Sequence, residues 1–173
     1  MRLLLLRHGK AASPDGIDDG DRPLTGRGRD ASRRMGLYLA QQGLVPDLAL
    51  VSAARRAQET WSLAEPALAG VPARSDARIY EAPPDRLLAV VREVTPEIGT
   101  LLMVGHNPGL EELLRMLLSR EERYAAAATM AKFPTAALAA VDLAASTWRA
   151  VTPGSGSLHR FVTPKSLGWG EED

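Results

Sequence analysis

Three short apolar runs, each followed at once by polar residues, stand out along the chain. They occupy residues 3–6, 48–51 and 100–104. A continuous apolar run of this length indicates a strand buried on both faces, as in parallel sheets that helices cover. The polar residues that follow the three runs are therefore expected at one edge of a sheet.

Segments with helical spacing of apolar residues lie between and after these runs. Helices are expected at residues 25–42, 54–69 and 85–94, and from residue 108 onward. Thr25 is the expected N-cap of the first helix, and Gly43 is expected to end it. The apolar face of that helix is expected to include Met35, Leu37, Tyr38 and Leu39.

The patterning weakens in the last third of the chain. Residues 136–143 and 147–151 indicate a pair of strands, residues 154–156 a flexible bend, and residues 79–80 a further short strand. Strands that alternate with helices predict an α/β fold, a three-layer αβα sandwich with a mainly parallel central sheet. Ligands of such sheets bind beyond the carboxyl ends of the strands.

The length and composition predict one folded domain over residues 1–173. Of these residues 45% are hydrophobic and 24% are charged, which argues against disorder. Lys and Arg number 21, as do Asp and Glu, so the basic excess typical of proteins that bind nucleic acid or anionic membranes is missing. We therefore expect neither a nucleic acid nor a membrane as a partner.

The cysteine and histidine content restricts the chemistry further. There is no cysteine, which excludes disulfides, thiolate metal sites and cysteine nucleophiles. Only three histidines are present, so no metal site and no cofactor are expected. The first apolar run is too short for a signal peptide, and no later run has transmembrane length, which favours the cytoplasm.

Basic residues follow all three predicted strands. The first is followed by Arg7, His8 and Gly9, the second by Ser52, Arg55 and Arg56, and the third by Gly105, His106 and Asn107. Guanidinium and imidazolium groups are suited to clamp a phosphoryl dianion, and arginine binds it in a bidentate way. The sequence therefore predicts a phosphoryl site at this edge of the sheet.

Four elements in this order resemble the signature of the histidine phosphatase superfamily, which includes the cofactor-dependent phosphoglycerate mutases. They are Arg7-His8-Gly9, Arg22-Pro23-Leu24-Thr25-x-x-Gly28, Ser52-x-x-x-Arg56-Ala57-x-x-Thr60 and Val104-Gly105-His106-Asn107-Pro108. The short length, the Arg-Pro-Leu-Thr element and the tail with Phe133-Pro134-Thr135 look most like the SixA-type phosphohistidine phosphatases. The resemblance implies a phosphoglycerate mutase-like fold.

The resemblance also implies roles for residues at the predicted edge. His8 would be the nucleophile, Arg7 and Arg56 would bind the phosphoryl oxygens, and His106 would complete the pocket. Arg56 is favoured over Arg55 because it follows Ser52 by four residues and directly precedes Ala57. His8 needs an acceptor for its second nitrogen, and the main chain near Gly9 is a candidate.

The proton donor is left open by the sequence. Family members that act on esters use a carboxylic acid, and Glu81 is the local candidate. Asp19 and Asp21 are alternative acids, and the other interpretation of these two carboxylates is that they set the potential of the pocket entrance or pair with Arg22. The resemblance to the SixA-type enzymes implies a third possibility, that no defined acid is needed. A phosphoramidate nitrogen that has picked up a proton leaves more easily than an ester oxygen.

The function expected from the resemblance is a metal-independent phosphatase of phosphohistidine in proteins, or of a small phosphorylated compound. Residues 10–22 and 121–135 are expected to select the substrate. A general phosphomonoesterase of the same fold is the first alternative, and a mutase ranks low because the chain has little room for a lid. A non-catalytic module that binds phosphate or phosphohistidine is the second alternative.

Overall fold

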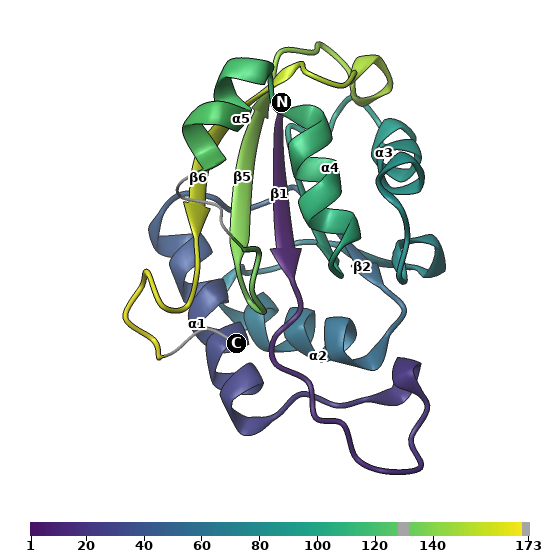
Figure 1. The fold of residues 1–173 in the computed structure, drawn as a ribbon, viewed down its shortest axis with the longest axis vertical. Helices are drawn as coiled ribbons and strands as arrows, with labels where there is room; N and C mark the ends of the chain where they lie inside the picture. The colour runs from purple at the N-terminus through teal and green to yellow at the C-terminus, as the bar shows by residue number, and fades with distance from the viewer. Residues whose placement is uncertain (128–131, 171–173) are drawn as a thin grey trace.

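A six-stranded sheet forms the centre of the computed structural model, which describes residues 1–127 and 132–170 (Figure 1). The strands are β1 (Arg2–Arg7), β2 (Leu48–Ser52), β3 (Ala73–Asp76), β4 (Thr100–Gly105), β5 (Leu138–Leu143) and β6 (Gly156–Val162). Their order across the sheet is β3-β2-β4-β1-β5-β6. The parallel pairs are β1 with β4, β4 with β2 and β2 with β3, whereas β5 runs antiparallel to both of its neighbours.

Helices cover both faces of this sheet. They are α1 (Gly26–Gln41), α2 (Arg55–Ala64), α3 (Pro84–Arg92), α4 (Gly109–Leu117) and α5 (Arg120–Ala127). Leu4 and Leu6 of β1 pack with Met35 of α1 on one face, whereas Leu3 and Leu5 pack with leucines of α3 and α4 on the other. The predicted α/β sandwich with a mainly parallel sheet is therefore confirmed, and Figure 1 shows α4 in front of the strands.

Helix α1 begins as the sequence predicts. Thr25 is its N-cap, and the Thr25 side chain accepts a hydrogen bond from the backbone nitrogen of Gly28 at 3.0 Å. Gly43 follows the helix with a φ of 66°, which suits a residue without a Cβ atom. Leu37 was wrongly expected on the apolar face, since its side chain is 52% exposed. It lies between the buried positions Met35 and Leu39 and points away from the sheet.

Three other expected elements differ from the structure. Helix α2 ends at Ala64 and continues only as a 3-10 turn, Glu65–Ala67. Ile79 ends a 3-10 turn, Ala77–Ile79, and the nearby strand is the preceding β3, whose largely exposed edge position removes the apolar signal. Residues 148–150 form a 3-10 turn because Trp148 is buried and donates to the carbonyl of Ile98 at 2.7 Å. The partner of β5 is instead β6, which begins within the expected bend.

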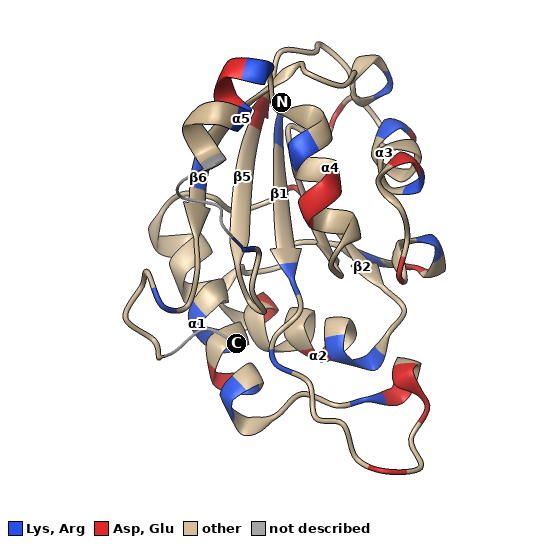
Figure 2. Ribbon diagram, viewed as in Figure 1, with Lys and Arg blue, Asp and Glu red and all other residues tan. Residues whose placement is uncertain are grey.

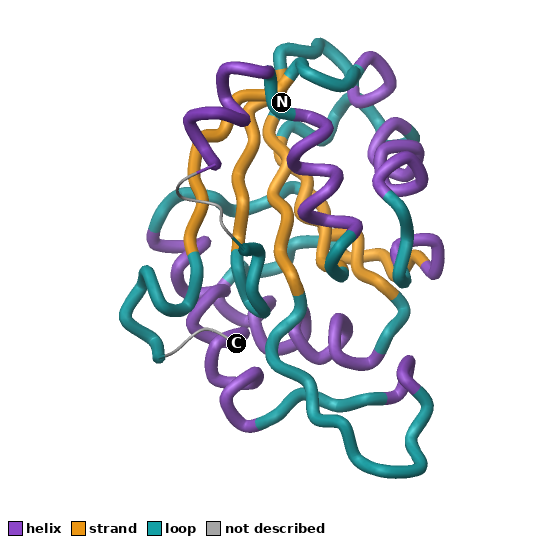
Figure 3. The backbone as a smooth tube through the Cα atoms, viewed as in Figure 1, coloured by secondary structure: helices purple, strands orange, loops and turns teal. Residues whose placement is uncertain are grey.

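The longest connection near the predicted edge joins β1 to α1 (Figure 3). It contains a 3-10 turn, Asp19–Asp21, which places acidic residues next to the start of α2 (Figure 2). Within the described residues, no helix combines the length and the apolar composition needed to cross a membrane.

Candidate active site

The carboxyl ends of β1, β2 and β4 meet at one edge of the sheet, as the sequence predicts. Arg7 of β1 pairs with Gly105 of β4, and Val51 of β2 pairs with Val104 of β4. The backbone nitrogen of His8 donates to the carbonyl of Gly105 at 3.1 Å. The residues directly after the three strands are therefore neighbours in space.

His8 is held in one orientation by its own loop. Its side chain is buried, and its Nδ1 lies 2.7 Å from the carbonyl oxygen of Gly9. A carbonyl oxygen only accepts, so Nδ1 carries the proton and the lone pair lies on Nε2. Arg56 Nε donates to that Nε2 at 3.2 Å. The nucleophilic nitrogen expected from the sequence therefore faces a guanidinium group.

The side chain of Thr60 connects the loop that holds His8 with the helix turn that carries Arg56. Thr60 Oγ1 accepts from the backbone nitrogen of Gly9 at 3.0 Å and donates to the carbonyl of Arg56 at 2.7 Å. Gly9 lies so close to α1 that an added Cβ atom would stand 2.6 Å from the carbonyl oxygen of Gly28. Sequence reasoning named the main chain near Gly9 as the acceptor for His8, which the structure bears out, but it gave Thr60 no role beyond its place in the motif.

Arg56 is buried and uses all three of its nitrogens. Its Nε contacts His8, its Nη1 donates to the carbonyl of Asp19 at 2.6 Å, and its Nη2 donates to Asp19 Oδ2 at 3.0 Å. Arg55 lies elsewhere: its side chain is 51% exposed and pairs with Glu59. The structure thus brings Arg56, and not Arg55, next to His8.

Arg7 and His106 complete the cluster. Arg7 Nη1 donates to the carbonyl of Phe133 at 2.9 Å, which holds the guanidinium at the end of β1. The His106 ring lies 5.1 Å from the His8 ring, and its Nε2 lies 2.7 Å from Ser52 Oγ. His106 Nδ1 is buried and has no hydrogen-bond partner among residues 1–127 and 132–170. A buried ring nitrogen of this kind suits a bound oxyanion.

Both imidazoles are neutral at pH 7. Burial lowers the pKa of His8 to about 3, and His106, Arg56 and Arg7 add to the effect, against the hydrogen bond to Gly9. Burial also lowers the pKa of His106 to about 4, with Arg56 as the next cause. A neutral His8 keeps its Nε2 lone pair at any working pH, as nucleophilic attack requires.

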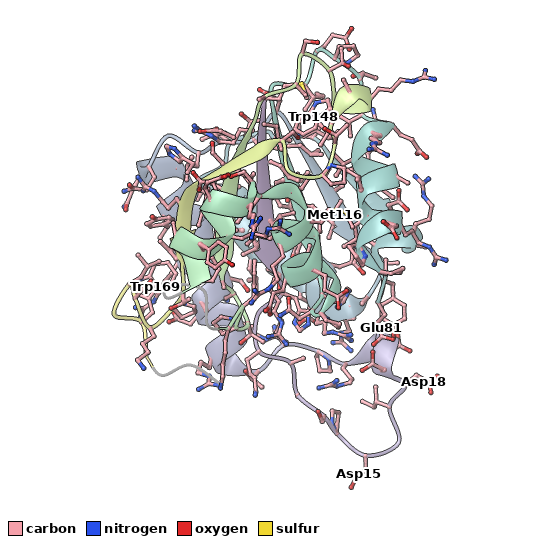
Figure 4. The ribbon with its side chains drawn as sticks, turned by 45° about the horizontal axis from the view of Figure 1, so that its top comes forward. Asp15, Asp18, Glu81, Met116, Trp148 and Trp169 are labelled. Atoms are coloured by element: carbon pink, nitrogen blue, oxygen red, sulfur yellow. The ribbon has the colours of Figure 1, made fainter. Side chains whose placement is uncertain are left out.

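The three candidate acids lie in different surroundings. The Asp19 carboxylate accepts from Tyr80 Oη at 2.6 Å and from Arg22 Nη1 at 2.9 Å, and these bonds, with Arg56, hold the pKa of Asp19 well below its usual range. Asp21 and Glu81 are exposed, and Figure 4 shows Glu81 pointing outward at the rim. Asp19 is thus the candidate carboxylate in contact with the cluster, and it is an anion.

The cluster combines an imidazole lone pair with cationic donors, a set suited to phosphoryl transfer. Within the described residues, no group of three or more His, Asp or Glu side chains is placed to hold a metal ion. Of the loops expected to select the substrate, residues 10–22 are described in full. In the second, residues 128–131 lie outside the described residues.

Comparisons with known proteins agree with this class of site. The sequence profile of the histidine phosphatase superfamily (branch 1) matches residues 3–86. An uncharacterised protein of Mycobacterium tuberculosis is 37% identical over 162 residues, which cover 92% of this chain and 100% of that protein.

Solved structures extend the likeness over nearly the whole chain. A protein assigned as the phosphohistidine phosphatase SixA from Agrobacterium tumefaciens has a TM-score of 0.80 and 29% identity, covering 94% of this chain and 97% of its own. The protein histidine phosphatase SixA in complex with tungstate has a TM-score of 0.79 and 28% identity, with coverages of 96% and 99%. The chain belongs to the histidine phosphatase superfamily and is SixA-like, which supports a phosphatase activity.

Proposed function

We propose that this chain is a metal-independent phosphatase that acts on phosphohistidine in proteins through a phosphorylated His8. The observation that carries the proposal is the His8 side chain, whose Nδ1 is bound to Gly9 and whose Nε2 faces Arg56 at 3.2 Å. The likeness to two SixA structures supports the substrate class. We further propose that the protein works in the cytoplasm, with neither nucleic acid nor membrane as a partner.

The reaction begins when the phosphoryl group enters between His8 and Arg56. The Nε2 lone pair attacks phosphorus in line, and the bond from phosphorus to the leaving nitrogen breaks on the opposite side. Arg7 and Arg56 stabilise the negative charge on the phosphoryl oxygens during the transfer. Water then attacks phospho-His8 and releases inorganic phosphate, which regenerates the neutral imidazole.

His106 acts on the same phosphoryl group in this proposal. Ser52 Oγ accepts from the backbone nitrogen of Ala54 at 3.3 Å, so its hydroxyl proton is available to His106 Nε2. In this proposal Nε2 accepts that proton in a hydrogen bond, so the neutral His106 ring carries its own proton on Nδ1, the nitrogen without a partner among the described residues. Nδ1 then donates to a phosphoryl oxygen, and Ser52 fixes the tautomer.

The test is a phosphatase assay in the presence of EDTA. A protein that carries phosphohistidine and p-nitrophenyl phosphate serve as the two substrates, with wild type, His8→Ala and His159→Ala as the enzymes. We expect EDTA-resistant turnover that favours phosphohistidine, is retained in His159→Ala, and falls roughly a thousandfold or more in His8→Ala. His159 lies on β6, away from the site, and is the matched control.

Two results would replace this proposal by one of its alternatives. A clear preference for the ester would make the protein a general phosphomonoesterase of the same fold. Binding of the phosphorylated protein without turnover of either substrate would make it a non-catalytic recognition module. Full activity of His8→Ala would show that the nucleophile lies elsewhere.

A further inference from the structure

A carboxylate stands beside the predicted phosphoryl pocket without a role in the mechanism above. Asp19 accepts hydrogen bonds from Arg56, Arg22 and Tyr80, and its side chain is still 43% exposed. It comes from the 3-10 turn in the loop between β1 and α1, and Figure 2 shows this acidic turn near the basic start of α2. An acidic side chain so close to a site for a dianion needs a physical reason.

We propose that Asp19 is a specificity-determining residue whose negative charge favours substrates with a protonated nitrogen leaving group over phosphate esters. The proposal rests on the proposed function and names the chemical feature by which that site would select phosphohistidine. It assigns to Asp19 a fixed charge and not the transfer of a proton.

The contacts of Arg56 place the charge of Asp19 next to the position where the phosphoryl group is transferred to His8. Arg56 presents Nε to the nucleophilic nitrogen of His8, while Nη1 and Nη2 bind the main-chain oxygen and carboxylate of Asp19. One planar guanidinium group therefore separates the carboxylate from the nitrogen that attacks phosphorus. The Asp19 side chain is also 43% exposed, so its charge can act on a leaving group that departs toward solvent.

Tyr80 lies next to Asp19 and adds an aromatic surface to this side of the site. Its hydroxyl donates to Asp19 Oδ2 at 2.6 Å, its ring meets the His106 ring edge-on at 5.5 Å, and the Arg56 guanidinium lies 5.8 Å from the ring centre. A flat cationic ring is well matched to an aromatic face beside a carboxylate. The imidazolium form of phosphohistidine has this shape and this charge.

The leaving-group chemistry explains why the charge matters. In phosphohistidine protonated on the ring nitrogen that does not bear phosphorus, the substrate ring is a cation. When the bond between phosphorus and nitrogen breaks, its electron pair stays on that nitrogen and the ring leaves as neutral imidazole, so no acid is required. An ester without an acid must instead expel an oxyanion, which the negative charge of Asp19 disfavours.

The charges of the surrounding groups explain why the charge of Asp19 affects which leaving group is favoured. Arg22 and Arg56 are both in contact with it, Arg7 is at the end of β1, and His8 and His106 are neutral at pH 7. Without Asp19 the cluster gains one unit of positive charge, which favours a departing anion. Asp19 itself stays ionised, because Tyr80, Arg22 and Arg56 lower its pKa.

The test compares Asp19→Asn, Asp19→Glu and the control Asp18→Asn on two substrates, a phosphohistidine-containing protein and p-nitrophenyl phosphate. Asp18 is an exposed acid directly before the same turn (Figure 4). For Asp19→Asn we expect kcat/KM to fall about tenfold for phosphohistidine and to stay level or rise for the ester. Asp19→Glu keeps the charge and should retain the wild-type preference, as should Asp18→Asn.

A pH profile separates selection by charge from a role in positioning Arg56 alone. With phosphohistidine, activity should decline as pH rises through the pKa of the substrate ring, and Asp19→Asn should move this decline to lower pH. An equal loss on both substrates with an unmoved profile would overturn the proposal and leave Asp19 as a positioning residue. If wild type hydrolyses only the ester, the proposed function fails, whatever Asp19→Asn does.

Discussion

The two buried histidines of the candidate site should make the fold sensitive to mild acid. In the folded protein the pKa is about 3 for His8 and about 4 for His106, whereas the ordinary value is 6.5. Between these limits the unfolded chain binds protons that the folded chain does not, so folding stability falls as pH falls below about 6.5. The penalty is absent above the ordinary pKa and grows until pH reaches the folded values.

The size of the loss at pH 5 depends little on the folded pKa values, because both lie below that pH. Each histidine then contributes the gap between pH 5 and its ordinary pKa, which corresponds to about 2 kcal/mol. The two histidines are only 8% and 5% exposed, so solvent screening reduces this figure little. From pH 7.5 to pH 5 we expect the free energy of unfolding to fall by about 4 kcal/mol.

Urea unfolding at pH 7.5 and pH 5.0, followed by tryptophan fluorescence, measures this difference. His8→Asn removes one titrating group and should reduce the loss to about 2 kcal/mol. His159→Asn replaces a partly exposed histidine on β6 and should leave the full loss in place. Asp76 and Asp142 add little to the loss of stability between pH 7.5 and pH 5.0, because their ordinary pKa of 3.8 lies below this range. A loss below about 1 kcal/mol in wild type, or an unchanged loss in His8→Asn, would refute the reasoning.

Three further substitutions test the packing beside the site, the hydrogen bond to His106 and the role of Glu81. Gly28→Ala would place a Cβ atom 2.2 Å from a backbone oxygen of the loop after β1 and should lower the free energy of unfolding by about 2 kcal/mol. Gly26→Ala is the control, because its Cβ atom would meet nothing within 4 Å. Equal urea midpoints for the two variants would contradict this expectation. Ser52→Ala removes the hydroxyl at His106 Nε2 and should lower kcat/KM about tenfold with the fold intact by circular dichroism; unchanged kinetics would show that the tautomer is held otherwise. Glu81→Gln should change kcat/KM less than about twofold on either substrate, and a large loss on the ester alone would restore Glu81 as the acid.

The sequence was most informative where apolar runs end in polar residues. The runs before His8, Ser52 and His106 are central strands, buried on both faces, and their parallel pairing brings these residues together at one edge. The resemblance of Ser52-x-x-x-Arg56-Ala57 to the family motif likewise implied that Arg56, and not Arg55, turns inward. Local patterns suffice for these features because burial on both sides of a strand leaves a continuous apolar signal.

Features that depend on contacts between distant segments left no such signal. Strand β6 is an edge strand with several half-exposed residues, so its pattern resembles a loop, and Trp148 gave a strand-like segment that is in fact a turn. The contact of Asp19 with Tyr80 spans 61 residues and becomes visible only when the loop folds back over α2. The sequence therefore indicated that His8, Arg56 and His106 lie together and that Asp19 is a candidate acid nearby, but not that Asp19 contacts Tyr80 and Arg56.

The hydroxyl of Thr60 has a consequence for how such a protein changes during evolution. It is fully buried, and it connects the backbone at Gly9 to the helix turn that carries Arg56. His8, Gly9 and Arg56 are therefore tied together in one unit that is built from the end of β1 and the first turns of α2. The loop that bears Asp19 contacts this unit through the side chain and the carbonyl of Asp19, so for the proposed phosphatase a different loop would change substrate choice while His8 and Arg56 keep their arrangement.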